Sequence, residues 1–166
     1  MNSILKKAAL AAALVTASLS ANAAQTDITV VATVDNNMTL LRADGSALPD
    51  SVTMSYNPVR GLSPWRDQVR IYSNDTSKDI QVRLAAAVEL VPTNTSASNP
   101  VPLTVSMKGK ALSVTPVDFT SGELFDGAIP DASIAMELAI SQTTLGKIAA
   151  AGNYEGMASI VLSPKP

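Results

Sequence analysis

Apolar and polar residues alternate along much of this chain in runs that are too short for helices. In the clearest run, residues 27–35, one face carries only apolar side chains and the other carries Thr29, Val31 and Thr33. The apolar face consists of Ile28, Val30, Ala32 and Val34. Because successive side chains of a strand point to opposite faces, the pattern predicts a strand with one face ready for burial. Further runs with strand character lie at 38–41, 52–56, 68–72, 80–90, 103–107, 111–115, 134–140 and 154–162.

Turn-forming residues separate these runs. Asp44-Gly45 is a strong turn signal, and glycine, proline, asparagine and serine gather in the other gaps. No amphipathic helical pattern lies between the runs. Short strands at this spacing are typical of an antiparallel β-sandwich of immunoglobulin (Ig)-like type, so we expect an all-β fold.

The first segment has the pattern of a secretory signal peptide. Lys6 and Lys7 precede an apolar stretch at 8–15, and the small residues Ala21 and Ala23 follow. The stretch is far shorter than the roughly 20 residues of a membrane-spanning helix. We therefore expect residues 1–23 to be removed, with cleavage after residue 24 as the alternative, and we expect a bacterial chain to pass through the periplasm.

Composition excludes most familiar catalytic and metal sites. The 166 residues include no cysteine and no histidine, which excludes disulfides, thiol nucleophiles, His-based triads and the usual zinc sites. Phosphate-binding, dinucleotide-binding and nucleophile-elbow motifs do not occur either. Asp75 and Asp79 lie four residues apart in a turn-rich stretch and are interpreted as turn residues. We expect no enzyme activity, no cofactor and no metal.

Charge argues against nucleic acid as a partner. After the two lysines of the signal segment are set aside, 10 basic and 14 acidic side chains remain, and they are scattered. The apolar face of 27–35 follows the predicted cleavage site by only a few residues and still needs a partner. It is either the first strand of its own sandwich or a strand added to a sheet of another molecule.

Four segments resemble one family over essentially the whole chain after the signal. They are DITVVATVD (27–35), LLRADGSALP (40–49), SNDTSK (73–78) and AGNYEG (151–156) followed by SIVL (159–162). In order and spacing they are similar to the major pilins of class 5, or alpha, chaperone-usher fimbriae, typified by colonisation factor antigen I and the cable pilins.

The resemblance implies an incomplete Ig-like sandwich that lacks its final strand. Residues 24–35 would be a donor-strand extension, 36–166 the pilin domain, and Ile28, Val30, Ala32 and Val34 the side chains that fill the groove of a neighbouring subunit. Subunits would join head to tail, and their partners would be a periplasmic chaperone, an outer-membrane usher and a tip adhesin subunit. The fibre would mediate adhesion at the cell surface. Asn36 and Asn37 stand where several members of the family have proline, so no proline switch is expected here.

The last strand supplies the predicted acceptor groove. Its alternate positions are Tyr154, Gly156, Ala158, Ile160 and Leu162, with Met157, Ser159 and Val161 on the other face. The small residues at 156 and 158 would leave room for donor side chains. Gly156 has a second interpretation, because glycine within a strand also marks a bulge.

Trp65 and Arg66 are candidates for a surface contact. Trp65 is the only tryptophan and would present an aromatic platform to a glycan or a neighbouring subunit, whereas packing in the core is the other interpretation. A receptor site on this chain would make the subunit itself an adhesin, which is the alternative to a purely structural function.

Overall fold

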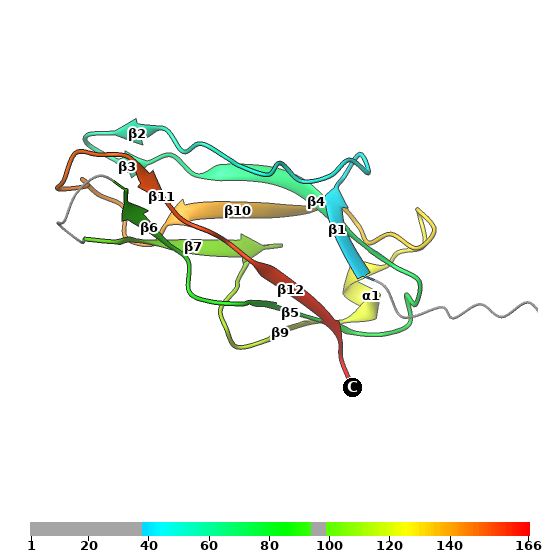
Figure 1. Cartoon of the computed structure of the whole chain (residues 1–166). Coiled ribbons are helices and arrows are strands. Elements are labelled where there is room, and N and C mark those ends of the chain that lie inside the picture. Colours follow the sequence, from blue (N-terminus) through cyan, green and yellow to red (C-terminus); the bar gives the residue numbers. More distant parts are fainter. Residues whose placement is uncertain (1–37, 94–98) are drawn as a thin grey trace, which may run out of the picture. The chain divides into compact units, whose positions relative to one another are not determined.

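The structure, a computed structural model, describes residues 38–93 and 99–166. The predicted signal peptide and the donor-strand residues Ile28, Val30, Ala32 and Val34 therefore lie outside the described residues. Regular structure within the described ranges is almost entirely β-strand, as the sequence predicts (Figure 1).

A seven-stranded antiparallel sheet forms the larger layer of the described chain. Its main path runs in the order β1-β4-β10-β7-β6-β11, and β8 pairs with β7 outside that path. The strands are β1 (Met38–Arg42), β4 (Trp65–Ser73), β10 (Met136–Gln142), β7 (Val101–Met107), β6 (Glu89–Pro92), β11 (Tyr154–Glu155) and β8 (Lys110–Ala111).

A smaller antiparallel sheet forms the second layer, in the order β12-β5-β9. It consists of β5 (Ile80–Leu84), β9 (Val117–Phe119) and β12 (Ile160–Pro164). A separate pair, β2 (Tyr56–Asn57) and β3 (Gly61–Leu62), forms a hairpin. A single turn of helix, α1 (Ser121–Leu124), follows β9. None of the helical structure in the described ranges has the length and apolar character needed to cross a membrane.

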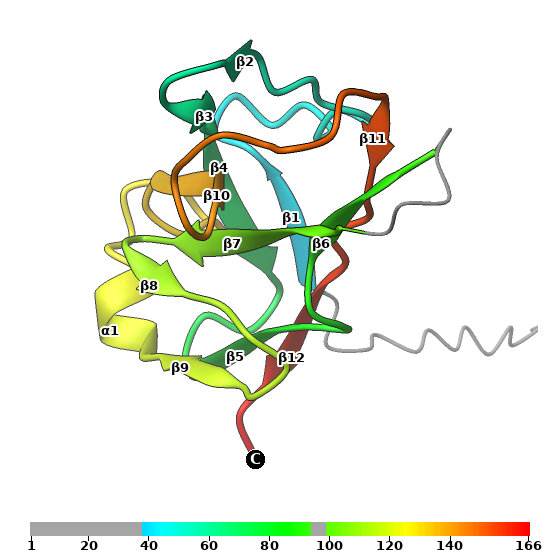
Figure 2. The ribbon, with the colours of Figure 1, turned by 90° about the vertical axis from the view of Figure 1, so that its left-hand side faces the viewer.

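The hydrophobic core lies between the two sheets, which face one another in Figure 2. Burial alternates along the strands as their sequences predict: Val69 and Ile71 of β4 are fully buried, and so is Val82 of β5. Phe119 of β9 is the largest fully buried side chain. This arrangement is an Ig-like β-sandwich.

Several predicted strands differ from the observed ones. The runs 80–90 and 154–162 each contain two strands, β5 with β6 and β11 with β12. The run 52–56 is strand only at its end, in β2, and of 111–115 only Ala111 is strand, in β8. Helix α1 was not predicted, although Thr120 and Glu123 form a capping box, in which the Thr120 Oγ1 accepts a hydrogen bond from the Glu123 N–H at 3.3 Å.

The two divided runs cross between the sheets together. β5 pairs with β12 in the small sheet, and β6 pairs with β11 in the large sheet. Between these ladders, residues 85–90 face the shorter stretch 156–159, so one chain bulges relative to the other. The apolar and polar residues alternate without a break through each run, although the chain passes from one sheet to the other within it. The periodicity of the sequence does not show where a chain changes sheets.

Candidate functional site

An apolar groove of about 1180 Å³ opens along the large sheet. Its floor is the inner face of that sheet, where β4, β10 and β7 continue toward the β2–β3 end beyond the small sheet (Figure 1). One wall is the segment 48–54 and the other is the segment 147–158. The floor residues are Trp65, Leu90, Leu103, Leu138 and Ile140.

Both walls carry backbone that is not paired in a ladder. Residues 48–54 belong to no strand and make no backbone hydrogen bond within the described ranges, and the same holds for 156–158. Pairing resumes at the edges, where the Ser63 N–H donates to the Ser55 carbonyl and the Ala85 N–H donates to the Ser159 carbonyl. An added strand would pair with N–H and C=O groups of this kind, which lie beside an apolar groove and have no partner within the described ranges.

The structure brings four of the five predicted groove residues to this site. Tyr154, Gly156, Ala158 and Ile160 line the groove. Leu162 does not line it; this side chain is partly buried in β12 and packs against the core. Met157 was expected on the opposite face, yet it lines the groove and is 82% exposed, because 156–159 has left the regular strand alternation.

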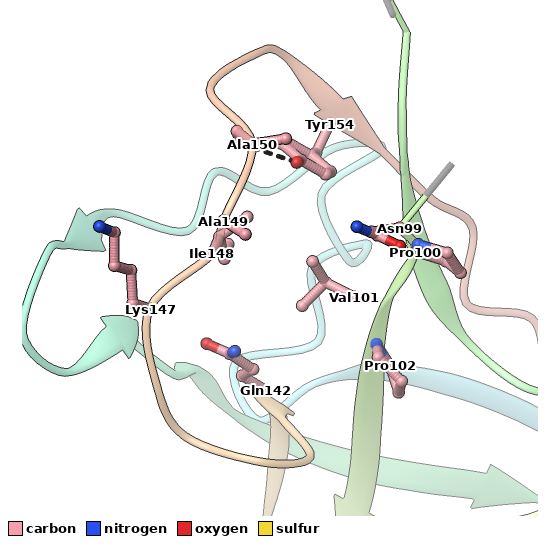
Figure 3. A pocket seen from close by; sticks show the side chains of 10 residues that line it. All are labelled: Asn99, Pro100, Val101, Pro102, Gln142, Lys147, Ile148, Ala149, Ala150 and Tyr154. Carbon is pink, nitrogen blue, oxygen red and sulfur yellow. Dashed lines mark hydrogen bonds between the residues drawn. The ribbon is translucent and has the colours of Figure 1, made fainter. Parts of the chain in front are cut away.

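Tyr154 is fixed in place by a neighbouring loop. Its hydroxyl donates a hydrogen bond to the Ala150 carbonyl at 2.9 Å, shown as the dashed line in Figure 3. The same region contains a smaller pocket of about 190 Å³, between the start of β7 and the loop after β10. The loop 147–153 therefore forms a structured wall of the groove.

Position 156 requires glycine because two backbone segments approach each other closely there. A Cβ at this position would overlap the Glu89 carbonyl oxygen. The missing side chain thus lets the chain pass the start of β6, which supports the bulge interpretation over the provision of room for a donor side chain.

Trp65 and Arg66 do not form one surface. Trp65 is partly buried, packs against the core and lines the groove. Arg66, the next residue along β4, forms an exposed ion pair with Glu137. Since consecutive strand residues point to opposite faces, the two side chains serve different surfaces, and a receptor contact at either stays a prediction.

The segment 48–54 and most of the floor were not identified from the sequence. A signal was present in the run 52–56, which had strand character but no assigned partner. Leu90 and Leu103 were predicted as strand residues, but only the pairing of their strands shows that they lie on the groove floor.

The groove lining includes three charged side chains, Asp50, Lys147 and Glu155. The acidic groups with lowered pKa values lie outside it; for example, hydrogen bonds from Ser77 lower the pKa of Asp75. Those bonds also place Asp75 in an Asx turn, as expected for this stretch. Within the described ranges no three acidic side chains cluster so that they could hold a metal. The groove can bind by burial and backbone pairing.

The sequence of this chain is similar to those of known fimbrial subunits. The sequence model of the CS1 type fimbrial major subunit family matches residues 24–163. The chain is 36% identical over 150 residues to a CFA/I fimbrial subunit of Escherichia coli, covering 87% of this chain and 88% of that protein. It is 34% identical over 164 residues to a CS1 fimbrial subunit of Escherichia coli, covering 93% and 94%.

A solved structure agrees with these relatives. The CooA pilin subunit from enterotoxigenic Escherichia coli superimposes with a TM-score of 0.66 at 29% sequence identity, covering 76% of this chain and 86% of that one. The resemblance noted from the four sequence segments is thereby confirmed. The chain belongs to the CS1-type fimbrial major subunit family and is a structural subunit of a cell-surface fimbria.

Proposed function

We propose that this subunit polymerises head to tail by donating its N-terminal extension, residues 24–35, to the groove of a neighbouring copy. The observation that carries the proposal is the groove itself, which is apolar on its floor and whose wall segments 48–54 and 156–158 make no backbone hydrogen bond within the described ranges. Ile28, Val30, Ala32 and Val34 would enter the groove.

The proposed donor has as many residues as one wall of the groove. Residues 28–34 would span about 23 Å as a strand at ~3.3 Å per residue, and the wall 48–54 also has seven residues. Burial of three large apolar side chains and one alanine contributes on the order of 5 to 10 kcal/mol before ordering costs are subtracted. A contact of this kind joins two different surfaces and does not close, so it builds a filament.

An unfilled groove also explains the export route that we propose. Exposed strand edges and apolar surface promote aggregation, so a subunit freed of its signal residues 1–23 in the periplasm requires protection. A periplasmic chaperone would occupy the groove until an outer-membrane usher exchanges it for the next subunit's extension. A tip adhesin subunit would begin the fibre, and the fibre would mediate attachment.

Two substitutions on neighbouring residues test the donor face. Val30 and Val31 are identical in chemistry but would lie on opposite faces of the extension once it forms the proposed donor strand. We expect Val30→Asp to abolish fibres when the full chain is expressed with its export machinery, because a carboxylate would be buried in the groove. Val31→Asp should leave fibres visible by electron microscopy.

A peptide distinguishes a donor defect from misfolding. The Val30→Asp subunit keeps an intact groove and should bind a synthetic peptide of residues 24–37 as tightly as the unmodified chain. The proposal is wrong if both aspartate variants form fibres equally well, or if the peptide binds neither protein.

A further inference from the structure

Two loops at the β2–β3 end of the described chain present exposed apolar side chains together. Val59, in the β2–β3 turn, is 85% exposed, and Leu145, in the loop after β10, is 67% exposed. The two loops are packed tightly, since a Cβ on Gly61 would lie 2.5 Å from the Gly146 carbonyl oxygen. Gly61 has a φ of +85°, which favours glycine. Val59 and Leu145 therefore flank one rigid junction.

Each exposed apolar residue has a basic neighbour. Arg60 follows Val59, and Lys147 lies two residues after Leu145; both are exposed, and neither forms an ion pair within the described ranges. Lys147 also lines the adjacent smaller pocket (Figure 3). The segments 57–62 and 143–152 contain no acidic residue. We name Val59, Arg60, Leu145 and Lys147 the basic end surface.

The loop before β10 has the opposite charge. Asp126 and Asp131 are exposed and form no ion pair within the described part of the chain, and Ile129 between them is 39% exposed. No basic residue lies in 126–131. We name Asp126, Ile129 and Asp131 the acidic end surface.

The neighbouring loop preserves this negative charge. The Ser73 N–H donates a hydrogen bond to the Asp131 carbonyl at 2.9 Å, so 73–79 lies beside the acidic end surface. That segment contains Lys78 but also Asp75 and Asp79. The two loops together therefore carry a net negative charge.

The two end surfaces lie at opposite ends of one strand. The acidic end surface precedes β10 and the basic end surface includes the loop that follows it (Figure 1). Seven residues of strand separate them by about 23 Å. They cannot meet within one molecule, but they can meet between two copies in a head-to-tail contact.

The proposed donor joint would bring these surfaces together. Tyr56 and Lys147 line the groove, so one of its mouths lies at the basic end surface. From Tyr154 the chain runs away from that mouth to Lys165, whose backbone N–H donates a hydrogen bond to the Asp79 carbonyl beside the acidic end surface. Every ladder in the described ranges is antiparallel. A donor that is antiparallel to 154–160, and hence parallel to the opposite wall 48–54, would leave the groove at the basic end surface.

The domain of the donating copy can then lie only close to the point where the donor strand leaves the groove. Its domain begins at Met38, which pairs with Ser73 beside its own acidic end surface. Only residues 36 and 37 separate the donor strand from Met38, and three peptide steps span at most about 10 Å. The acidic end surface of the donor must therefore approach the basic end surface of the acceptor.

We infer that the basic end surface docks on the acidic end surface of the next copy, as a second contact beside the donor strand. This inference rests on the proposed donor-strand polymerisation. Val59 and Leu145 would pack against Ile129 while Arg60 and Lys147 face Asp126 and Asp131. Opposite charges would steer the incoming copy, and the apolar contacts would fix the orientation of one domain relative to the next.

Charge reversal tests the contact. Arg60→Glu with Lys147→Glu should slow assembly of the full chain by about tenfold or more at low ionic strength, measured by light scattering. Asp126→Lys with Asp131→Lys should slow it similarly. All four substitutions in one chain recreate opposite charges and should restore the rate to within about threefold. Arg83→Glu, on β5 away from both surfaces, changes the net charge by as much as Arg60→Glu alone and is the control for that single variant.

Peptide binding separates this contact from the donor strand. A synthetic peptide of residues 24–37 fills the groove without a second domain. The unmodified chain, the Asp126→Lys/Asp131→Lys variant and the single variant Arg60→Glu alter no groove-lining side chain and should bind it equally. If the peptide fails to bind the unmodified chain, the donor-strand proposal itself fails. If the peptide binds but the double variants assemble at the original rate, or the fourfold variant stays slow, the end contact is overturned.

Discussion

The backbones of Gly156 and Glu89 lie in contact. A Cβ atom added to Gly156 would overlap the Glu89 carbonyl oxygen. The contact lies where the run 154–162 leaves β11 and crosses toward β12, beside the matching crossing from β5 to β6. One position without a side chain thus lets two chain segments change sheets side by side.

Gly156→Ala should destabilise the folded domain by about 1–3 kcal/mol, because either β6 or the groove wall must move to accommodate the methyl group. Urea unfolding of the protein with the 24–37 peptide bound measures the change. Gly122→Ala is the matched control: no atom lies within 4 Å of its added Cβ, and alanine favours helix α1. An equal loss of stability in the two variants would contradict the contact.

Trp65 should report occupation of the groove. It is partly buried, lines the groove and is the only tryptophan. We expect its fluorescence emission to shift to shorter wavelength when the 24–37 peptide is added, because the peptide would exclude water from the indole. The Val30→Asp peptide should produce no shift at the same concentration. A constant emission at saturating peptide would place the binding segment elsewhere.

The sequence predicted the sandwich more reliably than the groove. Strands such as β4 and β10 bury alternate residues between two layers, so their periodicity is visible in the sequence alone. The sheet to which each strand belongs depends on pairing between distant segments, which leaves no periodic signal. For that reason 80–90 and 154–162 were predicted as single strands, and Met157 was assigned to the wrong face.

The groove wall 48–54 shows a further limit. Only residues 52–54, within the run 52–56, have strand character, and the backbone of the wall pairs with nothing in the described ranges that would show its place. Conversely, Tyr154, Ala158 and Ile160 were found because they continue the alternation of the last run. Leu162 continues the same alternation but packs against the core beyond the groove's end.

Gln142 should hold the basic end surface together. Its buried side chain accepts a hydrogen bond from the Leu62 N–H at 3.0 Å through Oε1 and donates one to the Gly146 carbonyl through Nε2 at 3.3 Å. Gln142→Leu keeps the volume but leaves the buried Leu62 N–H without its partner, so stability should fall by about 1–3 kcal/mol.

Gln142→Leu should also slow assembly by more than its loss of stability accounts for. The reason is that the β2–β3 turn and the loop after β10 would no longer be held together at their junction. Thermal unfolding and the light-scattering assembly rate measure the two effects. Gln81→Leu, which removes an exposed hydrogen bond to Asp118, serves as the control. Unchanged unfolding in Gln142→Leu would show that the bridge is dispensable.

Asp118 and Lys165 fasten the C-terminal segment to β9 and should make stability depend on pH. Lys165 donates a hydrogen bond to the Asp118 carboxylate at 2.6 Å, and this bond is the main cause that lowers the pKa of Asp118 and raises that of Lys165.

Because the pKa of Asp118 is lower in the folded state, the unfolded chain takes up a proton at a higher pH than the folded chain does. The stability that Asp118 contributes is therefore present above its ordinary pKa of 3.8 and is lost as pH falls through the folded-state pKa. The contribution of Lys165 is present below its ordinary pKa of 10.5 and lost as pH rises through its raised pKa. Asp118→Asn should therefore flatten the stability profile below about pH 4 in urea titrations. Identical profiles for Asp118→Asn and the unmodified chain would contradict the linkage.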